Sequence, residues 1–200
     1  GVTALTPEVY AALAVLRQAK AFSPEIFTVA GGHHATLLPE DFLVAGVDAV
    51  ALGEAELVFP LLVRAVADRI DPVHVPNLVW RDRDGRFVHN ATAEASDDLD
   101  ALPLPRRDLT EAYRGHYFFG LAQPDTALIT ARGCPYRCSF CSVWAFHQGR
   151  TRKMCAERVV RELKTIRTKN VTFVDDNFLL DHRRESEIAD RIRAEGLDLG

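Results

Sequence analysis

Short apolar runs and segments with one apolar face alternate over the first third of the chain. The runs have the length and β-branched content of strands, and they lie at Gly1–Leu5, Glu25–Ala30 and Asp48–Leu52. The other segments carry apolar residues at helical spacing. They predict a helix with Thr6 as N-cap and Pro7 at its first position, then helices at Pro39–Ala45 and Glu56–Ile70. This alternation predicts a parallel sheet with helices on both faces.

The pattern changes after Asp71. Two strand-like runs, Asn77–Arg81 and Arg86–Asn90, flank a turn rich in Asp and Gly and predict a hairpin. An acidic, proline-bearing stretch, Ala91–Arg107, predicts a linker. Strand and helix then alternate again, at Thr126–Ala131, Ala156–Ile166, Val171–Val174 and Arg184–Ala194. We therefore expect an α/β domain over residues 1–72, a hairpin and linker over 73–120, and a second α/β domain over 121–200.

Composition narrows the function classes. A formal net charge of −4 gives no reason to expect nucleic acid or an anionic membrane surface as a partner. The longest apolar run, around Tyr10–Leu16, is too short to cross a bilayer, and no signal peptide is visible. We expect a cytoplasmic protein whose thiols stay reduced. The chain starts at Gly1 rather than Met and stops at Gly200 after a helical pattern, which we interpret as an internal piece of a longer protein.

Three of the four cysteines lie close together after a predicted strand. Cys134, Cys138 and Cys141 have the spacing C-x3-C-x2-C. A loop with this spacing can wrap three thiolates around one cubane cluster and leave the fourth iron without a protein ligand. An open coordination position is where a substrate or cofactor can bind a metal centre.

Other interpretations of these cysteines compete with a cluster. A disulfide is disfavoured in a reducing compartment. A zinc site would combine the three thiols with His147 or Cys155 as the fourth ligand. Buried, unreactive cysteines rarely gather in a loop that also carries glycine, proline and arginine. Outside a zinc site, we expect Cys155 to be a small buried hydrophobe.

The cysteine segment resembles the signature of the radical S-adenosylmethionine (SAM) superfamily, C-x3-C-x-aromatic-C, with Phe140 in the aromatic place. The resemblance implies a partial (β/α) barrel with a [4Fe–4S] cluster at its mouth, held by Cys134, Cys138 and Cys141. It implies that SAM binds the open iron and that one electron cleaves it to methionine and a 5′-deoxyadenosyl radical. It also implies that Phe140 lies beside the adenine, that a flavodoxin or ferredoxin donates electrons, and that no side chain beyond the cluster ligands is catalytic.

A second candidate segment follows the next predicted strand. In the family the end of this strand meets the amino group of SAM, and Asp175 and Asp176 occupy the matching positions. Their carboxylates can accept hydrogen bonds from an ammonium group. The family's usual sequence there is Gly-Gly-Glu, which this chain lacks. A helix N-cap or a polar strand end is the competing interpretation.

Three motifs in the first domain resemble, by their order, the cobalamin-binding Rossmann-like domain that precedes the barrel in one branch of radical SAM enzymes, the class B type. They are Thr3-Ala4-Leu5, Gly31-Gly32 and Gly53-Glu54. The resemblance implies contact with the nucleotide tail of cobalamin for Thr3, Leu5, Gly31, Gly32 and Gly53. The family's upstream Asp-x-His-x-x-Gly motif is absent, and His33 and His34 are not expected to be cobalt ligands. The expected fold is α/β: a cobalamin-binding domain, incomplete at its N-terminus, followed by the first part of a radical SAM barrel.

Within this branch, Ser142–Phe146 and Gln148-Gly149-Arg150 look most like hopanoid methylases, with anaerobic magnesium-protoporphyrin monomethyl ester cyclases close behind. The resemblance implies cobalamin-dependent methylation of an unactivated carbon on an apolar, polycyclic small molecule. Oxidative cyclisation or rearrangement with the same cofactors is the first alternative. A zinc-stabilised binding module without catalysis is the alternative from another class. Trp144 and Phe146 would line the substrate pocket or pack in the core.

Overall fold

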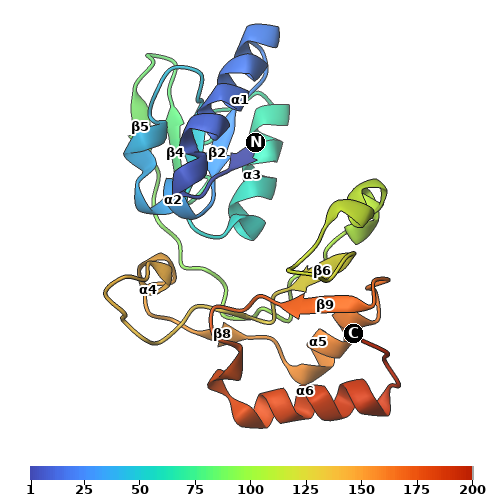
Figure 1. Ribbon diagram of the computed structural model, residues 1–200. Coiled ribbons are helices and arrows are strands. Elements are labelled where there is room, and N and C mark those ends of the chain that lie inside the picture. Colours follow the sequence, from blue (N-terminus) through green and yellow to red (C-terminus); the bar gives the residue numbers. More distant parts are fainter. Residues whose placement is uncertain (200) are drawn as a thin grey trace. The chain divides into compact units, whose positions relative to one another are not determined.

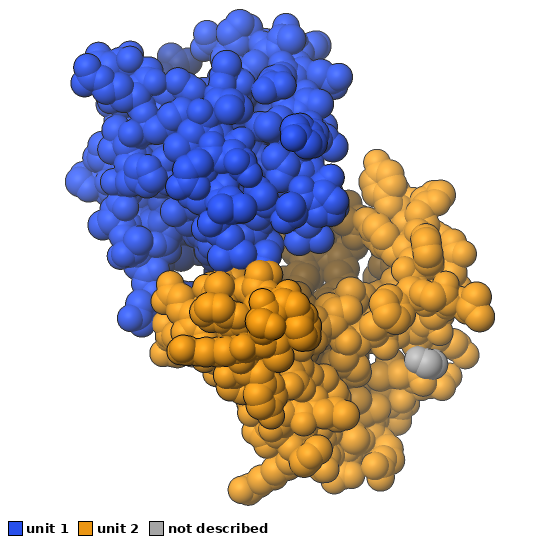
Figure 2. Space-filling view, turned by 60° about the vertical axis from the view of Figure 1, so that its left-hand side comes forward, with its two compact units in different colours: residues 1–95 blue, residues 96–200 orange. Residues whose placement is uncertain are grey.

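The computed structural model describes residues 1–199, and Gly200, the last residue of the predicted second domain, lies outside the described residues. The chain folds into two compact units, residues 1–95 and residues 96–200 (Figure 2). Each unit has its own strands and its own buried apolar core. Over residues 1–199, no helix has both the length and the apolar character that crossing a membrane requires.

Unit 1 is built on a five-stranded sheet whose strands follow one another in chain order (Figure 1). Its first three strands, β1 (Val2–Thr3), β2 (Val29–Gly31) and β3 (Ala49–Ala51), are parallel, as the alternating pattern predicts. The predicted hairpin is present as β4 (Leu78–Arg81) and β5 (Phe87–His89). Because β4 pairs antiparallel with β3, the hairpin extends this sheet.

Helices cover both faces of the unit 1 sheet. One apolar cluster lies beneath α1 (Val9–Phe22) and α2 (His33–Leu37), and a second lies beneath α3 (Ala55–Ala67). Val50 belongs to the first cluster and its neighbour Ala51 to the second, because successive side chains of a strand point to opposite faces. The predicted arrangement of helices on both faces is confirmed.

Three predicted boundaries in unit 1 are wrong. Leu5 rather than Thr6 is the N-cap of the first 3-10 turn, because the Glu8 carboxylate accepts a 2.8 Å hydrogen bond from the Leu5 backbone N–H. Residues 25–28 lie before the strand, because the chain must first turn after α1. The helix predicted at residues 39–45 is a 3-10 turn, η2 (Pro39–Phe42), and the short helix α2 before it was not predicted.

Unit 2 combines a parallel and an antiparallel pair of strands with helices. Its elements are η3 (Arg107–His116), β6 (Asp125–Leu128), β7 (Ala131–Arg132), α4 (Val143–Phe146), β8 (Arg152–Lys153), α5 (Ala156–Leu163), β9 (Asn170–Phe173), η4 (Phe178–Leu180) and α6 (His182–Ala194). Strands β6 and β9 are parallel, and β7 and β8 are antiparallel. Leu128 of β6 packs with Val159 of α5 and Ile188 of α6, so these helices cover one face of the parallel pair.

Part of the predicted linker is packed onto unit 2. Leu99 is buried in the unit 2 core. The Asp100 carboxylate accepts a 2.9 Å hydrogen bond from the Cys155 N–H. The buried Arg158 guanidinium donates to two backbone carbonyls of the same segment, at 3.3 and 3.5 Å. We call residues 96–107 the strap, because they bind along α5.

Candidate functional site

The three clustered cysteines lie on one loop between β7 and α4. They are not in disulfides; Cys134 and Cys141 are half-buried and Cys138 is exposed. The Cys141 N–H donates to the Cys138 carbonyl at 3.1 Å, which closes the last turn of the loop. Three reduced thiols on one short loop are the donor set that an iron–sulfur cluster requires.

The loop presents these thiols without closing them around a common point. Over residues 1–199, no three His, Cys, Asp or Glu side chains are gathered closely enough to hold a metal ion. Three cysteine thiols are the right ligands for a cluster, but in this structure their sulfur atoms do not surround a common point. The assignment of Cys134, Cys138 and Cys141 as cluster ligands stays a prediction.

The two residues considered as a fourth zinc ligand are engaged elsewhere. Cys155 is the N-cap of α5, where its Sγ accepts a 3.4 Å hydrogen bond from the Arg158 N–H. The expectation that Cys155 is buried is wrong, because this position at the end of the helix is exposed. The His147 Nδ1 accepts from Arg152 at 3.4 Å, and its Nε2 lies 3.6 Å from the Asp176 Oδ2.

Asp175 holds Thr130 and Ala131, which lead into the cysteine loop and form what we call its base. Its Oδ1 accepts hydrogen bonds from the Thr130 N–H at 2.5 Å and the Ala131 N–H at 3.0 Å, and its Oδ2 accepts from the Thr130 hydroxyl at 2.5 Å. Arg184 of α6 donates to the Thr130 carbonyl at 2.8 Å, so both backbone groups of this buried threonine are held. The carboxylate is thus occupied by the protein, and its contact with SAM stays a prediction.

Asp176 fixes the residue before the first cysteine. Its Oδ2 accepts a 2.8 Å hydrogen bond from the Gly133 N–H. Gly133 has φ +86°, and a Cβ there would lie 2.0 Å from the Arg150 carbonyl oxygen. Glycine is therefore required where the loop base passes the segment after α4. Together the two aspartates give the cysteine loop a fixed starting point, and a contact of Asp176 with SAM also stays a prediction.

The aromatic residues around the loop differ in exposure. The Phe140 side chain is 91% exposed, so it can pack against a ligand, and its predicted contact with adenine stays a prediction. Trp144 is half-buried, and the Arg137 guanidinium lies 5.8 Å from the centre of its ring. That distance is within the range of a cation–π contact, which ties the loop to α4.

In unit 1 the predicted cobalamin motifs meet at the carboxyl ends of the parallel strands. Thr3 is the register partner of Gly31. Gly32 has φ +93°, and a Cβ on it would lie 2.2 Å from the Thr3 Oγ1. The Thr36 hydroxyl donates to the Gly32 carbonyl and accepts from the Gly53 N–H, both at 2.8 Å. Sequence analysis did not assign a role to Thr36, which joins the two glycine loops.

His34 holds the loops around these glycines. It is buried, with its Nδ1 3.0 Å from the Thr6 Oγ1 and its Nε2 2.8 Å from the Asp41 Oδ2. Both ring nitrogens are thus engaged within the protein, in line with the expectation that His34 is not a cobalt ligand. Leu5, the last residue of its motif, is 54% exposed and available to a ligand.

Asp181, at the start of α6, has a lowered pKa. Asp181 is the N-cap of α6, where it accepts hydrogen bonds from Lys153 at 3.0 Å and from the Arg184 N–H at 3.3 Å. The Lys153 ammonium, followed by the backbone N–H, holds the pKa of Asp181 below its usual range. The side chain thereby ties β8, beside the cysteine loop, to α6.

Known proteins resemble both units. Family models match as a B12 binding domain over residues 1–63 and as the radical SAM superfamily over residues 128–199, which confirms the predicted order of the two α/β parts. Hopanoid C-3 methylase of Methylococcus capsulatus is 35% identical over 184 residues, which are 90% of this chain and 34% of the methylase. The anaerobic magnesium-protoporphyrin IX monomethyl ester cyclase of Rubrivivax gelatinosus is 34% identical over 151 residues, 73% of this chain and 27% of the cyclase.

The fold is similar to that of a solved enzyme over nearly the whole chain. The cobalamin-dependent SAM radical enzyme OxsB, solved with aqua-cobalamin and SAM bound, matches with a TM-score of 0.71 at 18% identity. The match covers 96% of this chain and 28% of OxsB. The chain thus spans about a third or less of the length of these relatives.

Proposed function

We propose, because the chain carries a B12-binding domain followed by a radical SAM domain, that it is part of a cobalamin-dependent radical SAM methyltransferase. The observation that carries the proposal is that both motif sets lie on one chain in this order. The cysteine loop follows β7, and the glycine loops meet at the ends of the parallel strands in unit 1. The 35% identity to a hopanoid methylase favours methyl transfer as the reaction.

In this proposal the cysteine loop binds the cluster and SAM. Cys134, Cys138 and Cys141 would each hold one iron of a [4Fe–4S] cluster and would leave the fourth iron open to SAM. When bound, the cluster supplies the electron that cleaves SAM to a 5′-deoxyadenosyl radical. The protein keeps the loop in place through the two aspartates after β9, and Phe140 offers an exposed ring to the adenine.

The carboxyl ends of the unit 1 strands are the proposed cobalamin site. The residues proposed to contact the nucleotide tail are Thr3, Leu5, Gly31, Gly32 and Gly53. Glycines expose the backbone N–H and carbonyl groups to close approach, and the tight contact of Gly32 with Thr3 leaves no room for a side chain. When bound, cobalamin supplies the methyl group.

The proposed reaction methylates an unactivated carbon of an apolar, polycyclic small molecule. We place it in the cytoplasm, with a flavodoxin or ferredoxin as electron donor. Oxidative cyclisation or rearrangement is a second candidate, favoured by the 34% identity to a cyclase. The two reactions differ in mass, because methylation adds one CH2 to the substrate and oxidative cyclisation removes hydrogen.

Anaerobic reconstitution with iron and sulfide tests the proposal. We expect near-stoichiometric cluster and an electron paramagnetic resonance signal that changes when SAM is added. Cys138→Ser should lose the cluster. Cys155→Ser is the matched control and should retain it, because serine can replace cysteine as the N-cap of α5. A colourless protein that binds one zinc through the loop cysteines would instead support the zinc-stabilised module.

A further inference from the structure

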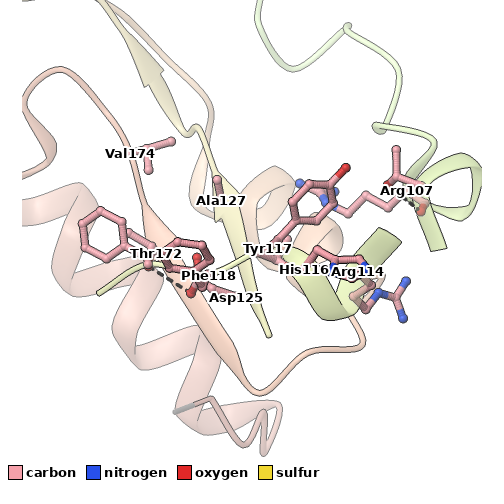
Figure 3. A pocket seen from close by; sticks show the side chains of 12 residues that line it. Arg107, Arg114, His116, Tyr117, Phe118, Asp125, Ala127, Thr172 and Val174 are labelled. Atoms are coloured by element: carbon pink, nitrogen blue, oxygen red, sulfur yellow. Dashed lines mark hydrogen bonds between the residues drawn. The ribbon is translucent and has the colours of Figure 1, made fainter. Parts of the chain in front are cut away.

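The cysteine loop is carried by a shorter pair of strands than the parallel pair that precedes it. Strands β6 and β9 share four register pairs, and the Thr172 hydroxyl also joins them by a 3.0 Å hydrogen bond to the Asp125 carboxylate (Figure 3). Strands β7 and β8, which flank the loop segment at residues 133–151, share two register pairs. We call the β7–β8 pair the stem. Because so short a ladder is marginal in water, the stem depends on contacts from other elements.

Arg184 of α6 bridges the stem at the end opposite to the loop. Its Nη2 donates to the Thr130 carbonyl at 2.8 Å, and its Nε donates to the Met154 carbonyl at 2.7 Å. Thr130 precedes β7 and Met154 follows β8, so one guanidinium joins both strands. The Thr130 carbonyl also accepts from the Met154 N–H at 2.9 Å. The planar guanidinium suits two carbonyls at once, whereas a lysine ammonium is a point charge on a flexible stem of carbons.

The guanidinium is held by carbonyl groups rather than by a carboxylate. Arg184 is 9% exposed, and the Glu185 Oε1 lies 3.9 Å from its Nη1, beyond hydrogen-bond distance. A buried charge is unfavourable unless hydrogen bonds compensate it, and the two carbonyls do so here. The helix α6 has other attachments, because Ile188 is buried in the unit 2 core and the Asp181 carboxylate binds Lys153. Without Arg184, α6 would keep these attachments, whereas the stem would lose its bridge.

We propose that Arg184 is a positioning residue for the three loop cysteines. It acts through the stem, because the bridge between the two carbonyls fixes where the loop segment begins and where it ends. Asp175 bonds residues that lead into the loop, whereas Arg184 also bonds a residue that follows it. The inference rests on the proposed function, since it takes these cysteines to be the cluster ligands. Arg184 itself contacts neither the cluster nor SAM in this proposal.

Amide hydrogen exchange of the cofactor-free chain tests the bridge. Arg184→Met removes the donors, so protection of the Met154 amide, which donates to the Thr130 carbonyl, should fall at least about tenfold. The amides of α5 should keep their protection. Arg184→Lys keeps the charge but not the planar fork, and the fall should be smaller, about threefold. Arg183→Met, at the exposed neighbour on the same helix, is the matched control and should change nothing at Met154.

The reconstituted protein tests the consequence for the cluster. The SAM concentration that gives half of the change in the electron paramagnetic resonance signal should rise at least about tenfold in Arg184→Met. It should rise less in Arg184→Lys and stay unchanged in Arg183→Met. Loss of the cluster from an Arg184→Met protein whose α5 amides remain protected would support the inference equally. A role confined to holding α6 would lower the fraction of folded protein without changing this SAM concentration.

Two results would overturn the inference. One is Met154 protection in Arg184→Met that stays within about threefold of the unsubstituted chain, or unchanged protection in Arg184→Lys if Arg184→Met does not fold. The other is an unchanged SAM titration in Arg184→Met. If the unsubstituted chain assembles no cluster, the proposed function fails, and the exchange of the Met154 amide still decides whether Arg184 holds the stem.

Discussion

Replacement of Asp175 by alanine should loosen the base of the cysteine loop. The substitution removes the acceptor of three hydrogen bonds, from the N–H and hydroxyl of Thr130 and from the N–H of Ala131. Thr130 is 0% and Ala131 6% exposed, so water cannot readily replace the carboxylate. Each buried donor left without a partner costs about 1–3 kcal/mol. Taking the lower end for each of the three donors, because the loop can relax, the local opening free energy should fall by about 3 kcal/mol.

Asp175→Asn is the matched substitution. The asparagine carbonyl oxygen can still accept from both N–H groups, and its NH2 can donate to the Thr130 hydroxyl. The expected loss is therefore only about 1 kcal/mol. The contact with SAM predicts a different pattern, in which asparagine weakens SAM binding and neither substitution loosens the loop. The pair of variants thus distinguishes a carboxylate that holds the loop from one that binds only the cofactor.

Amide hydrogen exchange of the cofactor-free chain is the suitable assay. Protection at Thr130 and Ala131 should fall about a hundredfold or more in Asp175→Ala and about tenfold or less in Asp175→Asn. Asp198→Ala, at a carboxylate whose side chain is 84% exposed, is the control and should leave both amides unchanged. Protection in Asp175→Ala that stays within tenfold of the unsubstituted chain would refute the reasoning.

Gly133→Ala would place a Cβ 2.0 Å from the Arg150 carbonyl oxygen, so unit 2 should be destabilised by about 2–4 kcal/mol. Calorimetry measures this, and an unchanged melting temperature would contradict it. Gly32→Ala would place a Cβ 2.2 Å from the Thr3 hydroxyl, so cobalamin retention on gel filtration should be lost while unit 2 melts normally. Because the pKa of Asp181 is lowered in the folded chain, its carboxylate stabilises the fold at any pH above the usual pKa of an aspartate, about 4. This stabilisation is lost as the pH falls below that value and through the lowered pKa. Urea unfolding of Asp181→Asn should therefore differ from that of the unsubstituted chain at pH 7, and the difference should shrink as the pH is lowered below about 4.

Sequence reasoning succeeded where a pattern depends on neighbours along the chain. The alternation of apolar runs and helical segments predicted the three parallel strands of unit 1. The resemblance to cobalamin-binding domains predicted that Thr3, Gly32 and Gly53 contact one ligand, and the structure brings these residues close together at the ends of the parallel strands, while the contact itself stays a prediction. Thr36 was missed, because it lies in a helix of five residues, which is too short to show helical periodicity.

Sequence reasoning failed where a contact depends on pairing between segments that are distant along the chain. The spacing of the cysteines predicts a set of cluster ligands, but it does not predict the hydrogen bonds of Asp175, which follow from the pairing of β6 with β9. That pairing brings together residues more than forty positions apart. Cys155 was assigned to the core on its hydrophobicity, whereas its place at the start of a helix decides its exposure.

The strap also determines where the chain can be divided. A shortened chain that begins at residue 121, where sequence reasoning places the second domain, would lack Leu99 and open a hole in the core beside α5. The paired side chains of Arg158 and Glu162, 2% and 3% exposed, would also lose the covering segment. A chain that begins at residue 96 would keep both. The junction at which one domain could be exchanged for another in evolution therefore lies before the strap, upstream of β6.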